Sequence, residues 1–183
     1  MEALWPSEDR VLLHAEGLVL REWAYDDVPA MVELFDTDEM NRWTPLPSPF
    51  DEEAAKRYVE SAHRLRVETH ALQLAITLDG HTPRGEVLLF PGGTDGSVEL
   101  AYAVGADHRG RGLARRAVNG ALALASKSGA STARLVIAMD NPSSRRVAQA
   151  TGFRLTGEPL TERRRKGFVL TMATWERPLT KAL

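Results

Sequence analysis

Residues 98–118 (VELAYAVGADHRGRGLARRAV) place the strongest constraint on what this chain can fold into. An alternating apolar run ends in a turn that holds Gly110, Gly112 and two arginines, and a helix-forming sequence follows directly. Backbone N–H groups in the first turn of such a helix have no partner within the helix, and the helix dipole favours negative charge there. Because glycine has no Cβ, a phosphate can approach the backbone closely. This order of elements predicts a phosphate-binding site between Arg109 and Ala114.

Two common phosphate motifs are excluded by their spacing. A Walker loop requires GxxxxGK[ST], which occurs nowhere in the chain. The dinucleotide fingerprint GxGxxG/A, counted from Gly110, fails because Arg115 stands at its last position. What remains is the shorter pattern R-x-x-G-x-A, which runs from Arg109 through Gly112 to Ala114.

A second strand and helix follow this turn and its helix. Residues 133–139 (ARLVIAM) form a short apolar, β-branched run that predicts a buried strand. The string NPSSRRVAQATGF then predicts a helix with Asn141 as its N-cap and Pro142 at its first position. Gly152 and Phe153 close that helix.

These two motifs resemble those of the GCN5-related N-acetyltransferase (GNAT) superfamily. In that superfamily [QR]-x-x-G-x-[GA] cradles the pyrophosphate of coenzyme A, and N-x-x-S opens a helix that ends in Gly-Phe. The RimJ/RimL-like branch, which acetylates ribosomal proteins at N-terminal alanine, is similar in two further respects. It shares the phrase EGLVLR at residues 16–21 and a glutamate before a tyrosine on the central strand, here Glu99 and Tyr102.

The resemblance implies an α+β GNAT fold, with a mixed, mostly antiparallel sheet that is splayed between strands 4 and 5. Six to seven strands and about four helices are expected, in one domain over residues 1–183. The sequence itself places strands at residues 17–23, 71–78, 86–90, 98–104, 133–139, 153–156 and 167–176. It places helices at residues 26–35, 51–68 and 112–128, with a fourth opened by residues 140–144 and closed by residues 151–153.

Composition excludes several other classes of protein. The chain has 23 Lys and Arg against 25 Asp and Glu, a net charge of −2, so direct nucleic-acid binding is not expected. It has no cysteine, which excludes disulfides, thiol nucleophiles and cysteine metal sites. No apolar stretch approaches the roughly 18 residues that span a bilayer, and the five histidines lack metal-ligand spacing. We therefore expect a cytoplasmic protein with no membrane partner and no metal. The sequence leaves open whether the protein forms a homodimer.

The resemblance implies acetyl-CoA as cosubstrate, an amine as acceptor, and roles for two side chains. Glu99 is the candidate base and Ser144 the candidate proton donor to the departing sulfur. The alternative interpretations are a carboxylate on the solvent side of a strand and an ordinary residue of the first helical turn. Many relatives carry a tyrosine four positions before Gly-Phe, where this chain has Ala148.

The expected binding residues fall in three groups. Coenzyme contacts are expected at Val104, Arg109, Gly110, Arg111, Gly112, Leu113, Ala114, Asn141 and Arg146. For Asn141 and Arg146 the alternatives are a helix cap alone and a solvated arginine. Trp43 and Tyr102 are candidate substrate-binding residues, and the alternative for Trp43 is a buried aromatic that anchors its loop. The basic run at residues 163–166 is interpreted as a solvated hairpin tip, or else as a surface that recruits an acidic or nucleic-acid partner.

Together these features predict an acetyl-CoA-dependent N-acetyltransferase that acts by direct transfer, since no cysteine is present to carry an acyl group. The α-amine of a protein N-terminus is the preferred acceptor. A small-molecule amine, such as a polyamine or an antibiotic, is the enzymatic alternative. The non-enzymatic alternative is an acyl-CoA-binding module without turnover.

Overall fold

The structure is a computed structural model that describes residues 11–92 and 95–180. Within these residues one sheet contains nine strands: β1 (Leu12–Ala15), β2 (Leu18–Glu22), β3 (Leu72–Thr77), β4 (Gly85–Pro91), β5 (Ser97–Val104), β6 (Thr132–Ala138), β7 (Arg154–Leu155), β8 (Thr161–Arg165) and β9 (Phe168–Pro178). The α-helices are α1 (Val28–Phe35), α2 (Asp38–Trp43), α3 (Glu52–Thr69), α4 (Leu113–Lys127) and α5 (Pro142–Ala150). Two short 3₁₀ helices, η1 (Tyr25–Asp27) and η2 (Ala106–His108), precede α1 and α4.

The strand order is β1-β2-β3-β4-β5-β6-β9-β7, and β8 pairs with β9 as a hairpin. Every neighbouring pair is antiparallel except β5 and β6, which are parallel and joined through α4. Parallel neighbours require such a crossover, whereas antiparallel neighbours need only a turn. The α+β GNAT fold expected from the resemblance is confirmed.

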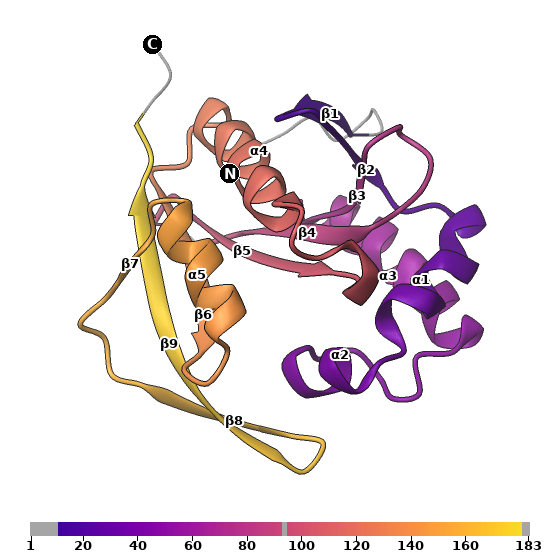
Figure 1. Ribbon diagram of the computed structural model, residues 1–183. Coiled ribbons are helices and arrows are strands. Elements are labelled where there is room, and N and C mark those ends of the chain that lie inside the picture. The colour runs from indigo at the N-terminus through magenta and orange to yellow at the C-terminus, as the bar shows by residue number, and fades with distance from the viewer. Residues whose placement is uncertain (1–10, 93–94, 181–183) are drawn as a thin grey trace.

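Helices cover both faces of the sheet (Figure 1). α4 and α5 pack on one face, where alternate residues of the strands, such as Leu74, Val87 and Leu100, form the larger apolar cluster with Leu113. α1, α2 and α3 pack on the other face, and Ala103 of β5 belongs to that second cluster. Because side chains alternate along a strand, neighbouring residues of β5 serve opposite faces of the sheet.

The sheet is split between its two parallel strands. β5 and β6 pair over only four positions, from Ser97 opposite Thr132 to Leu100 opposite Leu135. β5 continues beside β4 as far as Val104, and β6 continues beside β9 as far as Ala138. Among the described residues, the second half of β5 therefore has no partner strand on its β6 side, which is the splay that the resemblance implies.

Three elements go beyond those expected. β1 and β8 lie at the margins of the sheet. The first four residues of β8, from Thr161, are all exposed, and neither strand has the apolar alternation that marks a half-buried strand. α2 has six residues, of which only Met40 is buried, and a helix this short has no apolar face to recognise. The basic run at 163–166 thus forms strand β8 and the turn after it.

Candidate active site

The N-terminus of α4 is an open cradle of backbone donors. Gly110 and Gly112 have φ values of +73° and +71°, a region that favours glycine, and a Cβ at either position would meet no atom within 4 Å. Arg116 N–H is the first to bond within the helix, to the Gly112 carbonyl at 3.0 Å. The three preceding N–H groups of α4 have no partner inside the helix, and the N-cap residue, Gly112, has no side chain to cap them. They can take an anion.

The split in the sheet exposes further backbone groups of β5. Gly105 N–H donates to the Arg84 carbonyl at 3.0 Å, on the β4 side. Alternation then directs the N–H and C=O groups of Tyr102 and Val104 to the other side, into the gap. The Val104 carbonyl accepts a hydrogen bond from Arg109 Nε at 3.0 Å, and the neighbouring groups are available to an extended ligand.

A cavity of about 800 Å³ runs from the cradle through the gap to the face under α3. This volume lies in the range of pockets that hold small ligands and cofactors. The expected site residues that line it are Trp43, Glu99, Tyr102, Val104, Arg109, Gly110, Gly112, Leu113, Ala114, Asn141, Ser144 and Arg146. Arg111 is exposed and does not line the cavity.

The two candidate proton-transfer residues approach the cavity from opposite faces of the sheet. Glu99 is exposed and shares its face of β5 with Ala103, under α1–α3. Ser144 lies in α5, and its hydroxyl has no hydrogen-bond partner within residues 11–92 and 95–180. Tyr102 packs on the α5 face, where its hydroxyl donates to the Ser144 carbonyl at 2.9 Å. Burial raises the Tyr102 pKa to about 12, so the phenol stays protonated and donates.

Two residues for which alternatives were left open have the structural role and also lie at the cavity. Asn141 Oδ1 accepts from Ser144 N–H at 3.0 Å as the α5 cap, and Asn141 also lines the cavity. Trp43 packs against the apolar cluster of β6 and β9 and lines the cavity as well. The Arg42 guanidinium lies 4.5 Å from the Trp43 ring centroid and pairs with Asp140 at 2.7 Å, which ties α2 to the turn before α5.

Two basic residues, Arg109 and His108, lie beside the cradle. Arg109 forms an ion pair with Glu39 of α2 in addition to its bond to Val104. His108 lines the cavity beside it, and its buried Nδ1 has no hydrogen-bond partner in the described residues. Burial, with the charges of Arg84 and Arg111, lowers the His108 pKa, so this imidazole is neutral near pH 7.

Sequence reasoning missed a buried carboxyl in the same cavity. Glu86 of β4 is 4% exposed, and Tyr58 Oη of α3 donates to its Oε2 at 2.6 Å. Burial raises the Glu86 pKa to about 7, against the opposing effects of Tyr58 and Trp23. The only signal in the sequence is a glutamate at the start of an otherwise apolar strand, because its burial depends on a tyrosine 28 residues away.

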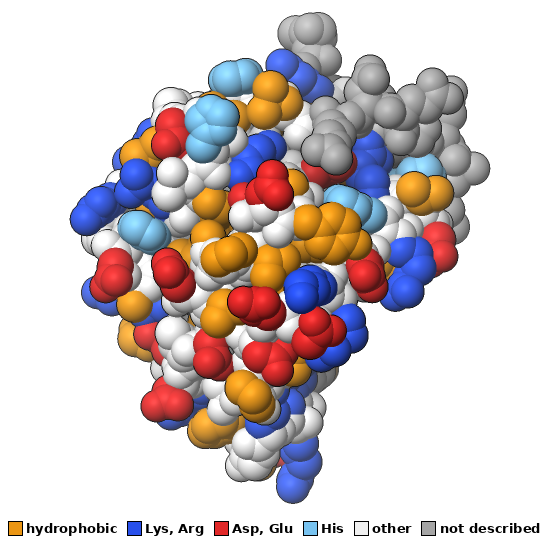
Figure 2. Space-filling view, turned by 90° about the vertical axis from the view of Figure 1, so that its right-hand side faces the viewer, with side chains coloured by type: hydrophobic (Ala, Val, Ile, Leu, Met, Phe, Trp, Pro, Cys, Tyr) orange, Lys and Arg blue, Asp and Glu red, His pale blue; other side chains and the backbone are white. Residues whose placement is uncertain are grey.

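The β8–β9 hairpin closes the cavity on its lower side. Arg163 and Arg165 of β8 line it, and Lys166 at the turn donates to the carbonyl of Leu46, in the loop after α2. Figure 1 shows the hairpin extending below α2. On the side shown in Figure 2, acidic side chains gather over the lower half and basic ones at the lowest tip. The residues that line the cavity include charges of both signs, such as Glu39, Arg163 and Arg165.

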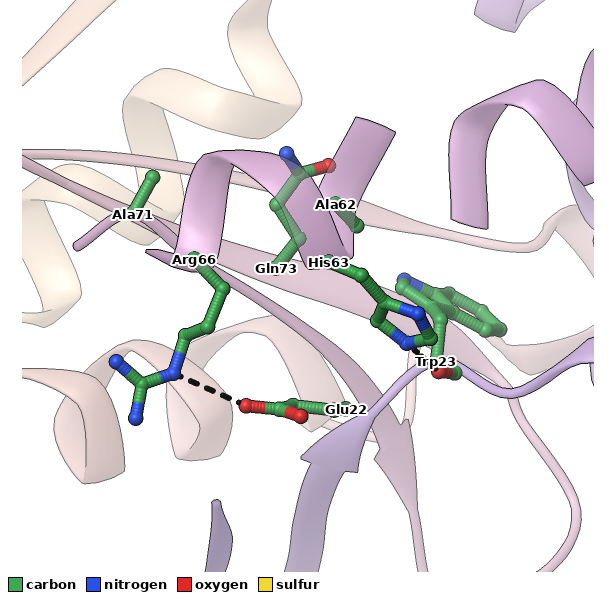
Figure 3. A pocket seen from close by; sticks show the side chains of 7 residues that line it. All are labelled: Glu22, Trp23, Ala62, His63, Arg66, Ala71 and Gln73. Atoms are coloured by element: carbon green, nitrogen blue, oxygen red, sulfur yellow. Dashed lines mark hydrogen bonds and ion pairs between the residues drawn. The ribbon is translucent and has the colours of Figure 1, made fainter. Parts of the chain in front are cut away.

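A second, small cavity holds no more than a water molecule. Its volume is about 10 Å³, and it lies between Trp23, Gln73 and His63, behind the Glu22–Arg66 ion pair (Figure 3). In the described residues no group of three or more His, Cys, Asp or Glu is placed to hold a metal ion. In that same part of the chain, no helix combines the length and apolar character that crossing a membrane requires.

Fold and site together define an acyltransferase that takes its acyl group from coenzyme A. The sequence matches the acetyltransferase (GNAT) domain family over residues 17–154, and the chain belongs to this family. GNAT enzymes use acetyl-CoA as cosubstrate, which confirms the cosubstrate expected from the motifs. A comparison with curated protein sequences gave no match.

Solved structures share the fold at low sequence identity. RimL, a ribosomal L7/L12 α-N-protein acetyltransferase in complex with coenzyme A, is 16% identical with a TM-score of 0.81, over 92% of this chain and 98% of its own. RimJ of Mycobacterium smegmatis is 21% identical with a TM-score of 0.79, over 97% and 90%. The microcin C7 self-immunity acetyltransferase MccE, bound to acetyl-CoA and AMP, is 17% identical with a TM-score of 0.75, over 97% and 99%. The expected similarity to the RimJ/RimL-like branch is confirmed at the level of the fold.

Proposed function

We propose that this protein transfers the acetyl group of acetyl-CoA to the α-amine of a protein N-terminus. The observation that carries the proposal is the continuous cavity that joins the α4 cradle, the gap beside β5 and the face under α3. Such a cavity admits the coenzyme from one face of the sheet and the amine from the other. Holding both reactants in the gap provides the proximity on which acyl transfer depends.

Three features of the chain support coenzyme A as the occupant. The free N–H groups of α4 and the two open glycines suit a pyrophosphate. The unpaired edge of β5 at Tyr102 and Val104 suits an extended arm with amide groups. The orphaned Nδ1 of His108 provides one more polar contact beside the cradle.

The proposed chemistry needs few protein groups. Acetyl-CoA supplies an acyl group that is already activated as a thioester. We assign to Glu99 the proton that the amine nitrogen loses as it bonds to the acyl carbon, directly or through water. We assign to Ser144 the proton that reaches the departing sulfur. Without a cysteine, transfer is direct.

The acceptor class rests on the similar structures and on the open mouth of the cavity. RimL is described as an α-N-protein acetyltransferase, which favours a protein N-terminus. MccE is described in complex with both acetyl-CoA and AMP, which favours a small-molecule amine as the second candidate. We propose a cytoplasmic enzyme in either case.

The first experiment is calorimetric titration of the purified chain with acetyl-CoA. We expect micromolar binding that Gly112→Glu abolishes, because a carboxylate there repels the pyrophosphate. Gly129→Glu is the matched control: Gly129 follows α4 at its opposite end, has a φ of +88°, and has the same open space for a Cβ. Absence of binding by the wild type at millimolar acetyl-CoA would overturn the proposal.

An acceptor screen then tests the acceptor class. Peptides that differ in their first residue are compared with the same peptides blocked at the α-amine, and with spermidine. Turnover of free peptides alone supports the N-terminal amine. Turnover of spermidine alone replaces it with the small-molecule alternative.

A further inference from the structure

Glu86 occupies a distinctive position in the cavity. It stands opposite Ala103 in the β4–β5 register, beside the stretch of β5 that has no partner on its β6 side. Glu99 lies four residues before Ala103 along β5, roughly 13 Å from it by the rise of a strand. At Glu99, β5 and β6 still pair. Glu86 is therefore level with the open gap, separated from it by β5, and it lines the same cavity.

The carboxyl of Glu86 is held in place but not saturated. Oε2 accepts the Tyr58 hydroxyl at 2.6 Å, while Oε1 accepts no hydrogen bond from a described residue. Trp23 also lowers the pKa of this carboxyl, although its indole N–H has no partner in hydrogen-bond geometry among the described residues. A carboxyl with one oxygen fixed and the other available, in a cavity wall, can bind a cationic donor.

The surroundings make a cation the favoured ligand. Ala75 and Ala103, the register neighbours of Glu86 on β3 and β5, are uncharged, as is Gln73 on the same face. Tyr58 is the titratable group of α3 that contacts Glu86. No positive side chain within the described residues shifts the Glu86 pKa. Burying a carboxylate without a cation is unfavourable, and an incoming ammonium group supplies the missing partner.

We propose that Glu86, oriented by Tyr58, is the site that binds the ammonium group of the acceptor and takes its first proton. The inference rests on the proposed function. In this step the ammonium group gives one proton to the Glu86 carboxylate, which leaves a neutral amine and a carboxylic acid. The proton that leaves when the C–N bond forms remains with Glu99. Glu86 therefore selects acceptors that arrive as cations.

A binding measurement tests this site without turnover. The ¹³C signal of the Glu86 carboxyl, assigned by its absence in Glu86→Gln, is titrated with pH in the presence of alaninamide. N-acetylalaninamide, which has no amine, is the control. Alaninamide is expected to lower the Glu86 pKa by about one unit or more, because a cation favours the charged carboxylate. A pKa that alaninamide leaves unchanged would overturn the inference.

Kinetics with an acceptor from the screen provide a second test. Glu86→Gln is expected to lower kcat/KM for the acceptor by about 100-fold while the Kd of acetyl-CoA stays unchanged. Tyr58→Phe removes a hydrogen bond to the charged form, so the acidic limb of the kcat/KM profile should move to higher pH. A merely structural role would leave that limb in place. If Glu86→Gln fails to fold, Tyr58→Phe and Glu86→Asp carry this test.

The outcomes separate the two proposals. Wild-type turnover that Glu86→Gln retains in full, with an unmoved pH profile, removes the inference and leaves the proposed function. Absence of wild-type turnover with every acceptor removes the proposed function, whereas the alaninamide titration still decides whether Glu86 binds a cation.

Discussion

The Tyr102 hydroxyl donates to the backbone carbonyl of Ser144 at 2.9 Å, which links β5 to α5 across the gap in the sheet. Ala148, at the position where many relatives carry a tyrosine, is fully buried in the core. A strand side chain thus supplies a phenol to the N-terminal turn of α5. The Tyr102 side chain of β5 and the Ser144 carbonyl of α5 thus connect the two sides of the gap.

Two substitutions separate this link from the proposed chemistry. Tyr102→Phe loses this hydrogen bond and leaves the Ser144 carbonyl with only its bond within α5, so we expect a loss of about 1 kcal/mol in the free energy of unfolding. Ser144→Ala keeps the carbonyl, so stability should be unchanged while turnover falls. Urea denaturation and steady-state kinetics measure the two effects. Equal turnover in Ser144→Ala and wild type would exclude Ser144 as the proton donor.

The cap and ligand roles of Asn141 can be resolved in the same way. Its Oδ1 accepts from Ser144 N–H at 3.0 Å, so Asn141→Ala should lower the free energy of unfolding by about 1 kcal/mol. Asn141→Asp keeps an acceptor oxygen and should keep this stability. If the amide NH₂ contacts the coenzyme, Asn141→Asp weakens acetyl-CoA binding in calorimetry. Unchanged affinity would leave Asn141 with the capping role alone.

Buried Glu86 makes stability depend on pH. Its pKa is about 7 in the folded protein and near 4.5 when exposed, so the folded state binds the extra proton between these values. The free energy of unfolding should therefore fall as pH rises from about 4.5 to about 7, by about 3 kcal/mol, and level off above.

Glu86→Gln removes this dependence and keeps an oxygen for the Tyr58 hydroxyl. The free energy of unfolding of the variant minus that of wild type should therefore be larger at about pH 8 than at about pH 5. Urea denaturation at both values measures the difference. A constant difference across that range would mean that the carboxyl is not buried as the structure shows.

The β8 hairpin should influence which acceptors bind. Arg163 and Arg165 line the cavity mouth, so replacing both with glutamate should raise KM about 10-fold for peptides with acidic residues after the first. Arg164→Glu is the matched control, because Arg164 does not line the cavity and pairs with Glu162 at 3.4 Å in solvent. A KM that rises equally in the control would point to net charge rather than to the mouth.

Local signals in the sequence predicted most of the helices and strands. The apolar alternation before Gly105, the glycines at 110 and 112, and the Asn141-Pro142 helix start act over a few residues, and the structure has a strand, an open cradle and a capped helix there. The elements that were missed, β1, α2 and β8, carry few buried apolar residues. β1 and β8 each pair with the strand that follows them across a two-residue turn, but the apolar alternation that would mark them as half-buried strands is absent.

The sequence by itself determined the family, the position of the cradle and most of the expected residues that line the cavity, but not Glu86. Only the tertiary structure decided how these residues face one another. Pairing of β5 with β6 over four positions opens the gap, and packing of α3 on the sheet brings Tyr58 to Glu86. Both depend on segments far apart in the chain that share a boundary only after folding. For the same reason the burial that changes the pKa of Glu86 is a property of the folded chain and not of its local sequence.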